Sequence, residues 1–325
     1  MGERVAFKVW ALIVLVVVSV IAVGCAERRS GLVVEDSTGS PPDGMGTSSD
    51  ILDESDLVQG GPGKDGIPSI DDPGFVSVAE ADGWLADGER VLAIDHMGQR
   101  RAYPLQILVW HEIVNDELGG DAVAITYCPL CDSGIAFDRV IDGEAVEFGT
   151  SGMLFNSNLV MYDRKTESYW TQIDGRAVIG ELSGRTLERI PVEMLTWGSY
   201  RDAYPDAEVL SRETGYRRPY GSDPYTGYYT SDEIKFPVEH RNDSIHPKTI
   251  VHGIHLENTT HAFLDTDIPP GGSIEEEIDG QQIVVNKDEI GSVTVTVEDE
   301  IRAEQRMFWF AWYAFHPDTG VYDGS

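Results

Sequence analysis

The sequence predicts a β-rich α+β fold with few helices, in which two similar β modules surround one core. Three observations support this prediction: short apolar runs alternate with turn signals, helical periodicity is confined to two stretches, and the chain resembles itself at a constant offset of 160 residues. Hydrophobic residues make up 41% of the 325 positions. That share is enough for a sizeable core in one large domain.

The first 25 residues have the features of a lipoprotein signal peptide. A basic start precedes an apolar run over residues 9–23, and Ala22-Val23-Gly24-Cys25 forms a lipobox. An uncleaved membrane anchor is the alternative, but the run is shorter than the roughly 20 residues that span a bilayer. We therefore expect lipidation of Cys25, contact with the membrane through that lipid, and a domain on the extracytoplasmic face of the cell membrane.

Residues 26–66 are expected to form a disordered acidic linker. They are rich in Gly, Ser, Pro and Asp and carry no sustained hydrophobic period. Folded structure is expected to begin near Ile67. Residues 67–325 are then expected to form a single globular domain.

The domain is expected to contain several short strands and few helices. Runs of β-branched and aromatic residues between turn signals predict strands at 90–94, 122–127, 134–137 and 145–148 and from 249 onward. Helices are expected at 105–114 and at 191–204, the second ended by Pro205. The aromatic tail, 308–317, is expected to be a buried closing strand or helix.

The internal resemblance pairs residues of about 90–148 with residues of about 250–308. Val91 corresponds to Val251, for example, and further apolar positions match at the same offset. Few positions are identical, so chance similarity between two β segments is an alternative. The constant offset favours an internal duplication.

The charge balance excludes some partner classes. There are 56 acidic and 24 basic side chains, and the formal net charge is −32. Such a surface repels nucleic acid, which is therefore excluded as a partner, whereas a protein or small-molecule partner is left open. Many carboxylates with few lysines are typical of proteins from salt-loving archaea, so an archaeal cell surface is the expected location. A merely acidic protein from another source is the alternative.

Cys128 and Cys131, in Cys-Pro-Leu-Cys, are the chain's best clue to chemistry. Cys25 is assigned to lipidation, so these two are the only thiols left for the mature domain. Two cysteines at this spacing can bind a metal, cycle as a dithiol or form a static disulfide. The matching stretch of the second copy is a polar turn between strands. We therefore expect the pair on a turn that joins two strands, and not at the start of a helix.

His111 and Met153 are the candidates to complete a metal site with the two cysteines. Two thiolates with an imidazole or a thioether suit Cu or Zn. A hydrogen-bonded structural histidine is the alternative for His111.

A second group of residues follows the cysteine turn and is rich in small and polar side chains. Special backbone angles are expected there because of its Gly and Asn content. Residues that could line a pocket, or belong to ordinary turns and core, are Ser151, Asn156, Tyr162, Asp163 and Trp170.

Several motifs in order resemble one known family. They are Tyr103-Pro104-Leu105, Trp110-His111-Glu112-Ile113-Val114-Asn115-Asp116, Thr126-Tyr127-Cys128-Pro129-Leu130-Cys131, Ser151-Gly152 with Asn156-Ser157, Met161-Tyr162-Asp163-Arg164, Thr196-Trp197 and the aromatic tail. Over about 67–322 the chain is similar to the family called domain of unknown function 3179. The resemblance implies an exported protein of bacteria or archaea, and it implies no mechanism.

The sequence thus leaves three functions open. It also leaves open whether the protein is an enzyme. The first is soft-metal binding, of Cu or Zn, or a redox role through the Cys128–Cys131 turn. The second is a thiol–disulfide protein in which the same cysteines cycle. The third is a non-catalytic ligand-binding surface module in which the cysteines form a structural disulfide.

Overall fold

The structure is a computed structural model and describes residues 50–324. The signal peptide, the lipobox with Cys25 and the linker as far as residue 49 lie outside these residues. The described chain is β-rich, with 41% strand and 9% helix. None of the helices in residues 50–324 is long and apolar enough to span a membrane.

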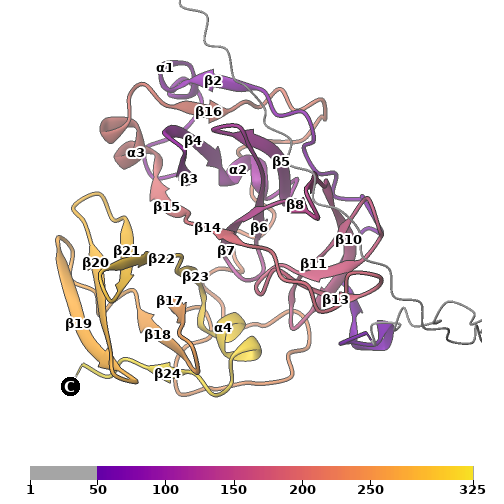
Figure 1. Ribbon diagram of the computed structural model, residues 1–325. Coiled ribbons are helices and arrows are strands. Elements are labelled where there is room, and N and C mark those ends of the chain that lie inside the picture. The colour runs from indigo at the N-terminus through magenta and orange to yellow at the C-terminus, as the bar shows by residue number, and fades with distance from the viewer. Residues whose placement is uncertain (1–49, 325) are drawn as a thin grey trace, which may run out of the picture. The chain divides into compact units, whose positions relative to one another are not determined.

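Five sheets of four or five strands carry the fold (Figure 1). Sheet I has the order β15 (Glu193–Thr196), β3 (Arg90–His96), β4 (Gln99–Pro104), β16 (Glu208–Leu210), β2 (Phe75–Ser77). Sheet II has the order β14 (Arg189–Ile190), β7 (Ser133–Asp138), β6 (Asp121–Cys128), β5 (Ile113–Leu118). Sheet III has the order β1 (Val58–Gln59), β10 (Phe148–Phe155), β11 (Asn158–Asp163), β12 (Tyr169–Thr171), β13 (Arg176–Ile179).

The C-terminal part of the chain supplies two more sheets. Sheet IV has the order β23 (Gln305–Phe308), β17 (Ile250–His255), β18 (Thr260–Leu264), β24 (Gly320–Val321), and sheet V has the order β19 (Gly272–Ile278), β20 (Gln281–Lys287), β21 (Val293–Val297), β22 (Glu300–Arg302). A small hairpin joins β8 (Val140–Ile141) to β9 (Glu144–Ala145). The α-helices of the described residues are all short: α1 (Val78–Ala81), α2 (Leu105–Leu108), α3 (Trp197–Ala203) and α4 (Trp309–Phe315).

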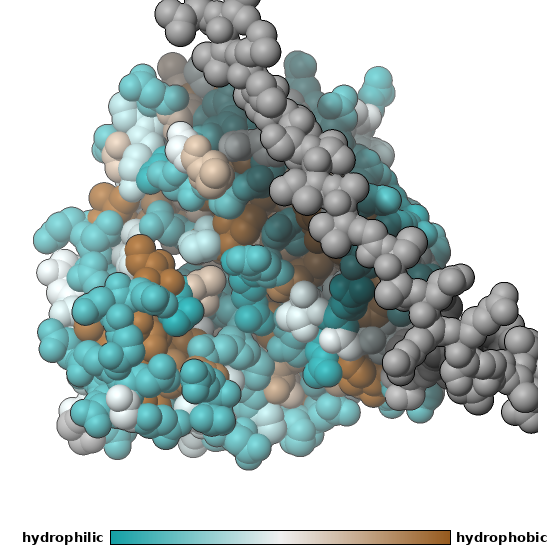
Figure 2. All heavy atoms as spheres, viewed as in Figure 1, coloured by the Kyte–Doolittle hydropathy of each residue, from teal (hydrophilic) through white to brown (hydrophobic). Residues whose placement is uncertain are grey.

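The five sheets are arranged as a propeller-like ring, which does not divide clearly into two modules. Side chains connect sheet II to sheet III through Ser133 and Gln172, and sheet III to sheet IV through Gln305 and the Ile173 carbonyl. Sheet V contacts sheet I, where the Ser292 hydroxyl donates to Glu193. Hydrophilic side chains cover most of the face in Figure 2, as the acidic composition predicts.

Strands form where the sequence predicts most of them. β3, β6, β7 and β17 cover the runs at 90–94, 122–127, 134–137 and 250 onward, so these predictions are confirmed. The run at 145–148 is divided, because β9 ends at Ala145 and β10 begins at Phe148. The aromatic tail is β23 followed by α4, with Trp309 and Trp312 buried.

Both predicted helices are shorter than expected. The helix expected at 191–204 begins only at Trp197, because Glu193–Thr196 pairs with β3 and Thr196 then caps the helix by accepting from Ser199 N. The helix expected at 105–114 ends at Leu108, and Ile113 already lies in β5. In both cases pairing in a sheet overrides the local helical pattern.

The part of the predicted linker that the structure describes is ordered against sheet III. Val58 pairs with Leu154 in β10, and Leu57 is buried. Further along, Asp65 N donates to Thr150 O. The prediction of a disordered linker up to residue 66 was therefore wrong for residues 50–66, because backbone pairing with an edge strand compensates for their few apolar side chains.

Candidate functional site

The two cysteines lie on the turn between β6 and β7. β6 ends at Cys128, β7 begins at Ser133, and these two residues pair across the hairpin. Cys131 N donates to Cys128 O at 3.2 Å, which closes the turn. The prediction of a turn between strands is confirmed, and the turn holds two buried free thiols.

Hydrogen-bond donors face the sulfur of Cys128. Burial opposes its thiolate, but hydrogen bonds from the Cys131 side chain and from the backbone N–H groups of Leu159, Cys131 and Leu130 outweigh burial and lower the pKa of Cys128. Burial and the neighbouring Cys128 raise the pKa of Cys131 well above its usual value. The pair is therefore asymmetric: the surroundings favour the thiolate at Cys128 and the protonated thiol at Cys131.

Buried amides hold Cys131 in place. Asn158 Nδ2 donates to Cys131 Sγ at 3.5 Å, and Cys131 Sγ donates to Ser157 O at 3.4 Å. Asn158 Nδ2 also donates to Gln172 Oε1 at 2.8 Å, which in turn accepts from Ser133 Oγ at 2.9 Å. This network connects the turn of sheet II to sheet III, so the thiol cannot shift without breaking several buried hydrogen bonds.

Glu112 is a buried acid beside the thiols. It lies between α2 and β5, where its backbone has φ +59°, a conformation rare for a residue with a long side chain. Burial and the neighbouring Cys128 raise the pKa of Glu112 well above its usual value, which favours the protonated carboxyl group. The sequence pointed to the neighbouring His111 and not to Glu112.

Strained backbone gathers around the cysteine turn. Besides Glu112, Asp132 has φ +51°, and Asn156 and Ser157 have φ +50° and +60°. Asp132 directly follows Cys131, and the Ser157 carbonyl accepts from its thiol. Such outliers cluster at functional sites, which makes this turn the leading candidate in the described residues.

Asp132 joins three sheets at the turn. Its carboxylate accepts from Arg90 Nη1 at 2.6 and 2.8 Å, from Arg306 Nη1 at 3.1 Å and from Tyr127 OH at 2.9 Å. Burial alone would raise the pKa of Asp132, but Arg306 and Arg90 outweigh it and lower the pKa. Asp132 is therefore ionised and fixes the position of the turn against sheets I and IV.

Residues 211–249, here called the tyrosine segment, cover the turn without forming a helix or strand. Tyr228 OH donates to Leu130 O at 3.0 Å. Lys248 Nζ lies 3.5 Å from the centre of the Tyr228 ring, and burial lowers the pKa of Lys248 to about 8. A connection this long without secondary structure is uncommon in a compact domain and often functional.

A small cavity of about 80 Å³ adjoins the turn. Its walls include Glu112, Tyr225, Met153 and the two leucines, Leu130 and Leu159, whose N–H groups face Cys128. The cavity therefore lies between the buried acid and the backbone that holds the thiolate.

The motifs around this site fall within a known family. The family described as a protein of unknown function (DUF3179) matches residues 64–305, which is more than half of the chain. The chain belongs to this family. No curated protein and no solved structure matched the chain.

In this DUF3179 protein, the predicted metal ligands have different surroundings. His111 Nδ1 lies 2.7 Å from Pro68 O and Nε2 lies 2.6 Å from Tyr220 OH, so both ring nitrogens are engaged in hydrogen bonds. Burial lowers the pKa of His111. Met153 lines the cavity beside the turn. The described residues contain no group of three or more His, Cys, Asp or Glu side chains that could hold a metal ion.

The predicted pocket residues are mostly occupied by structural contacts. Ser151 Oγ donates to Val160 O at a bulge in β10, and Asn156 Nδ2 donates to Ala314 O at 3.2 Å. Asp163 Oδ2 accepts from Trp170 Nε1 at 2.9 Å, and Trp170 is fully buried in the core.

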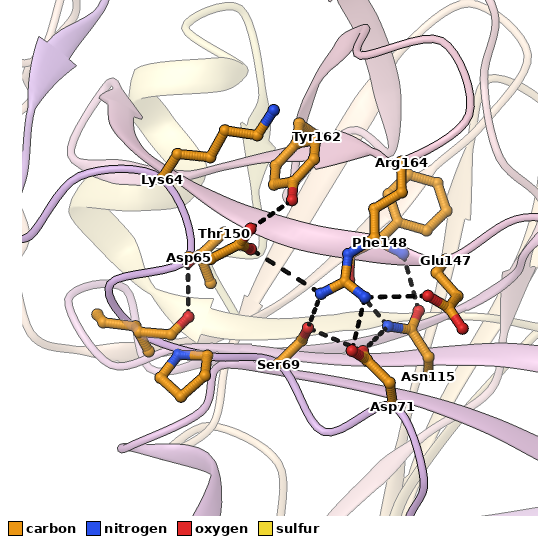
Figure 3. Close-up of polar contacts among 12 residues, drawn as sticks. Lys64, Asp65, Ser69, Asp71, Asn115, Glu147, Phe148, Thr150, Tyr162 and Arg164 are labelled. Carbon is orange, nitrogen blue, oxygen red and sulfur yellow. Dashed lines mark hydrogen bonds and ion pairs between the residues drawn. The ribbon is translucent and has the colours of Figure 1, made fainter.

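Tyr162 belongs to a polar cluster that fastens residues 64–71 to the ring (Figure 3). Tyr162 OH donates to Asp65 Oδ2 at 2.6 Å. Arg164 Nη1 donates to Asp71 Oδ2 at 2.6 Å and to Glu147 Oε2 at 2.9 Å. These groups face one another, so the cluster holds the chain in place.

Proposed function

We propose that Cys128 and Cys131 form a redox-active dithiol, in which Cys128 is the nucleophile and Cys131 closes the disulfide. One observation carries this proposal: the Cys128 sulfur faces the N–H groups of Leu130, Cys131 and Leu159 together with the Cys131 thiol. The thiolate is the reactive form of cysteine, and donors of this kind stabilise it as a helix N-terminus does elsewhere.

The rest of the site supports this assignment. Thiol–disulfide chemistry needs one deprotonated and one protonated sulfur, which is the state that the asymmetric surroundings favour. The strained residues Glu112 and Asp132 flank the pair in the fold. Outside the cytoplasm such a pair alternates between dithiol and disulfide according to its reduction potential.

Soft-metal binding is the second candidate, and one observation favours it. Met153 lines the cavity beside the cysteine turn, together with Leu130 of that turn. Two thiolates and a thioether are soft ligands, which Cu(I) prefers. We propose Zn as the other metal that the two thiolates could bind.

Thiol and metal measurements on the full chain separate these functions. A redox dithiol gives two titratable thiols after reduction, none after oxidation, and a reversible reduction potential. The Cys131→Ser variant should keep a thiol that iodoacetamide alkylates below pH 8, while Cys128→Ser should lose it. About one copper or zinc per chain, lost in both variants, would favour the metal. If no physiological thiol buffer reduces the disulfide, the cysteines have a structural role, and the third function, a ligand-binding surface module, is favoured.

We also propose that the domain is held at the extracytoplasmic face of the membrane through a lipid on Cys25. The apolar run and lipobox of the sequence support this location. A Cys25→Ser variant should then leave the membrane fraction and retain its fold. If this variant stays in the membrane fraction, the lipid is not the anchor.

We propose further that sheets I and II are related to sheets IV and V by internal duplication. Trp197 N donates to Glu89 O at 2.6 Å, and Trp309 N donates to Thr249 O at 2.8 Å. The carbonyl residues follow the 160-residue offset of the sequence, whereas the two tryptophans are 112 residues apart. In the first copy, strands β8 to β14, which include most of sheet III, lie between Glu89 and Trp197. This inserted segment accounts for the smaller offset between the two tryptophans.

A further inference from the structure

The buried position of the two thiols limits what can reach them. Cys128 is 2% exposed and Cys131 is fully buried. The tyrosine segment covers the turn, with Tyr228 bonded to Leu130 between the two cysteines. Attack on a protein disulfide needs the thiolate in contact with a sulfur of the partner chain. A polypeptide cannot make that contact while this cover is in place.

A small molecule has a place beside the same turn. The adjoining cavity holds about 80 Å³, and about 10–15 Å³ of a volume of this kind is enough for one water molecule. The space therefore suits a solute of several heavy atoms. Leu130 and Leu159 connect the cavity wall to the Cys128 sulfur through their N–H groups.

One carboxyl group lines the cavity. Burial and the neighbouring Cys128 raise the pKa of this group, Glu112, which favours the protonated form that can donate a proton. Tyr225 is the other ionisable side chain of the lining, and burial raises its pKa, so it stays neutral as well. The acid and the space for a small solute thus adjoin Leu130 and Leu159, whose N–H groups face the Cys128 sulfur.

We propose that the oxidant of the Cys128–Cys131 pair is hydrogen peroxide or a hydroperoxide of similar size, and that Glu112 protonates the leaving oxygen. The inference rests on the proposed dithiol function. The Cys128 thiolate attacks the terminal peroxide oxygen, the O–O bond breaks, and the second oxygen takes the Glu112 proton and leaves as water from hydrogen peroxide or as an alcohol from a hydroperoxide. Cys128 becomes a sulfenic acid and Glu112 a carboxylate.

The second thiol completes the oxidation. Cys131 sulfur attacks the sulfenic sulfur of Cys128, the S–S bond forms and the S–O bond breaks. The departing hydroxide takes the Cys131 proton and leaves as a second water. Glu112 recovers from solvent the proton that Cys128 released when it ionised. In sum, one dithiol and one hydrogen peroxide give one disulfide and two waters.

Oxidation rates of the reduced full chain test this inference. Mass spectrometry after rapid alkylation follows the loss of thiol with hydrogen peroxide and with the bulky cumene hydroperoxide. We expect hydrogen peroxide to react at least tenfold faster than with free cysteine, and cumene hydroperoxide at least tenfold slower than hydrogen peroxide. Glu112→Gln should slow the peroxide reaction by 10-fold or more, as expected for loss of a general acid.

Matched controls separate chemistry from folding. Glu117→Gln changes an exposed glutamate of the neighbouring β5 and should leave the rate unchanged. Gly61 lines the cavity and an added Cβ there meets no atom within 4 Å. Gly61→Phe should therefore slow the reaction by obstructing the cavity. Gly63→Phe, at an equally open glycine outside the lining, should not.

The two levels of proposal fail in different ways. If the pair forms a reversible disulfide in a redox buffer of the small thiol 2-mercaptoethanol, but peroxide reacts no faster than with free cysteine or Glu112→Gln has no effect, the peroxide inference is overturned and the dithiol function stands. If no disulfide forms in any buffer, both are overturned.

Discussion

Replacing Asp132 by asparagine should destabilise the domain strongly. The Asp132 carboxylate is 3% exposed and lies between Arg90 and Arg306, with Nη1···Oδ2 distances of 2.6 and 3.1 Å. Asparagine keeps the shape of the side chain and removes its charge. The two guanidinium groups then face a neutral amide, and the turn with Cys131 loses the group that fixes it against sheets I and IV.

The size of the loss follows from the burial of the partners. Removing one member of a buried ion pair costs about 3–5 kcal/mol. The side chains of Arg90 and Arg306 are 31% and 19% exposed, so water screens part of the unpaired charge. We expect a decrease in the free energy of unfolding of about 2–4 kcal/mol. For a domain of this size that corresponds to a decrease in Tm of roughly 5–10 °C.

Urea unfolding followed by tryptophan fluorescence at pH 7 measures this loss. The matched control is Asp87→Asn, because the Asp87 side chain is 75% exposed in its ion pair with Arg201; it should change stability by about 0–1 kcal/mol. A loss below about 1 kcal/mol for Asp132→Asn, at an unchanged urea dependence, would refute the view that this carboxylate holds the three sheets together.

Acidification gives an independent check on the same group. The pKa of Asp132 is lowered in the folded protein. Its stabilising contribution is therefore complete above the unfolded pKa of about 3.9 and is lost as pH falls through the lower folded value. The difference in stability between wild type and Asp132→Asn should shrink over that window.

Three further predictions concern other parts of the domain. The pKa of Lys248 is lowered to about 8 in the folded protein. The free energy of unfolding should therefore increase as pH rises from about 8 to the unfolded pKa of about 10.4, and urea titrations of Lys248→Met should not show this increase. Gly253→Ala places a Cβ 2.3 Å from the buried Trp312 ring and should lower stability by about 1–3 kcal/mol, whereas Gly74→Ala meets no atom within 4 Å and should be neutral by the same assay. His111→Gln should lower stability by about 1–3 kcal/mol through its lost hydrogen bonds and leave the alkylation rate of Cys128 unchanged.

The sequence was informative about the cysteine pair. Its match to a polar turn between strands at the 160-residue offset predicted that Cys128 and Cys131 lie on a turn joining two strands, and this is what the structure has. It was misleading at Glu193–Thr196, where a helical pattern yields to pairing with β3. The sequence also predicted a linker for residues 50–66. No local pattern indicates that Val58 pairs with β10, because its partner strand is almost a hundred residues away.

The parts of the site that sequence reasoning missed are distant in sequence. Arg90 is 42 residues and Arg306 is 174 residues from Asp132, the group that they both bind. Glu112 adjoins His111 in the chain, yet the carboxyl lies beside Cys128 and the imidazole contacts Pro68 and Tyr220. The helix expected at 105–114 gave no hint of the positive φ at Glu112.

By itself the sequence determined a β-rich domain, an acidic surface and a cysteine pair on a hairpin turn, because composition, alternation and turn chemistry act over a few neighbouring residues. Only the tertiary structure decided how the two sulfurs differ in their surroundings. The N–H groups of Leu130 and Cys131 lie in the same turn as Cys128, but that of Leu159 belongs to β11 of sheet III, so this donor meets the Cys128 sulfur only when the sheets pack. A pKa depends on every group within a few ångströms, and the packing of the five sheets determines which groups those are.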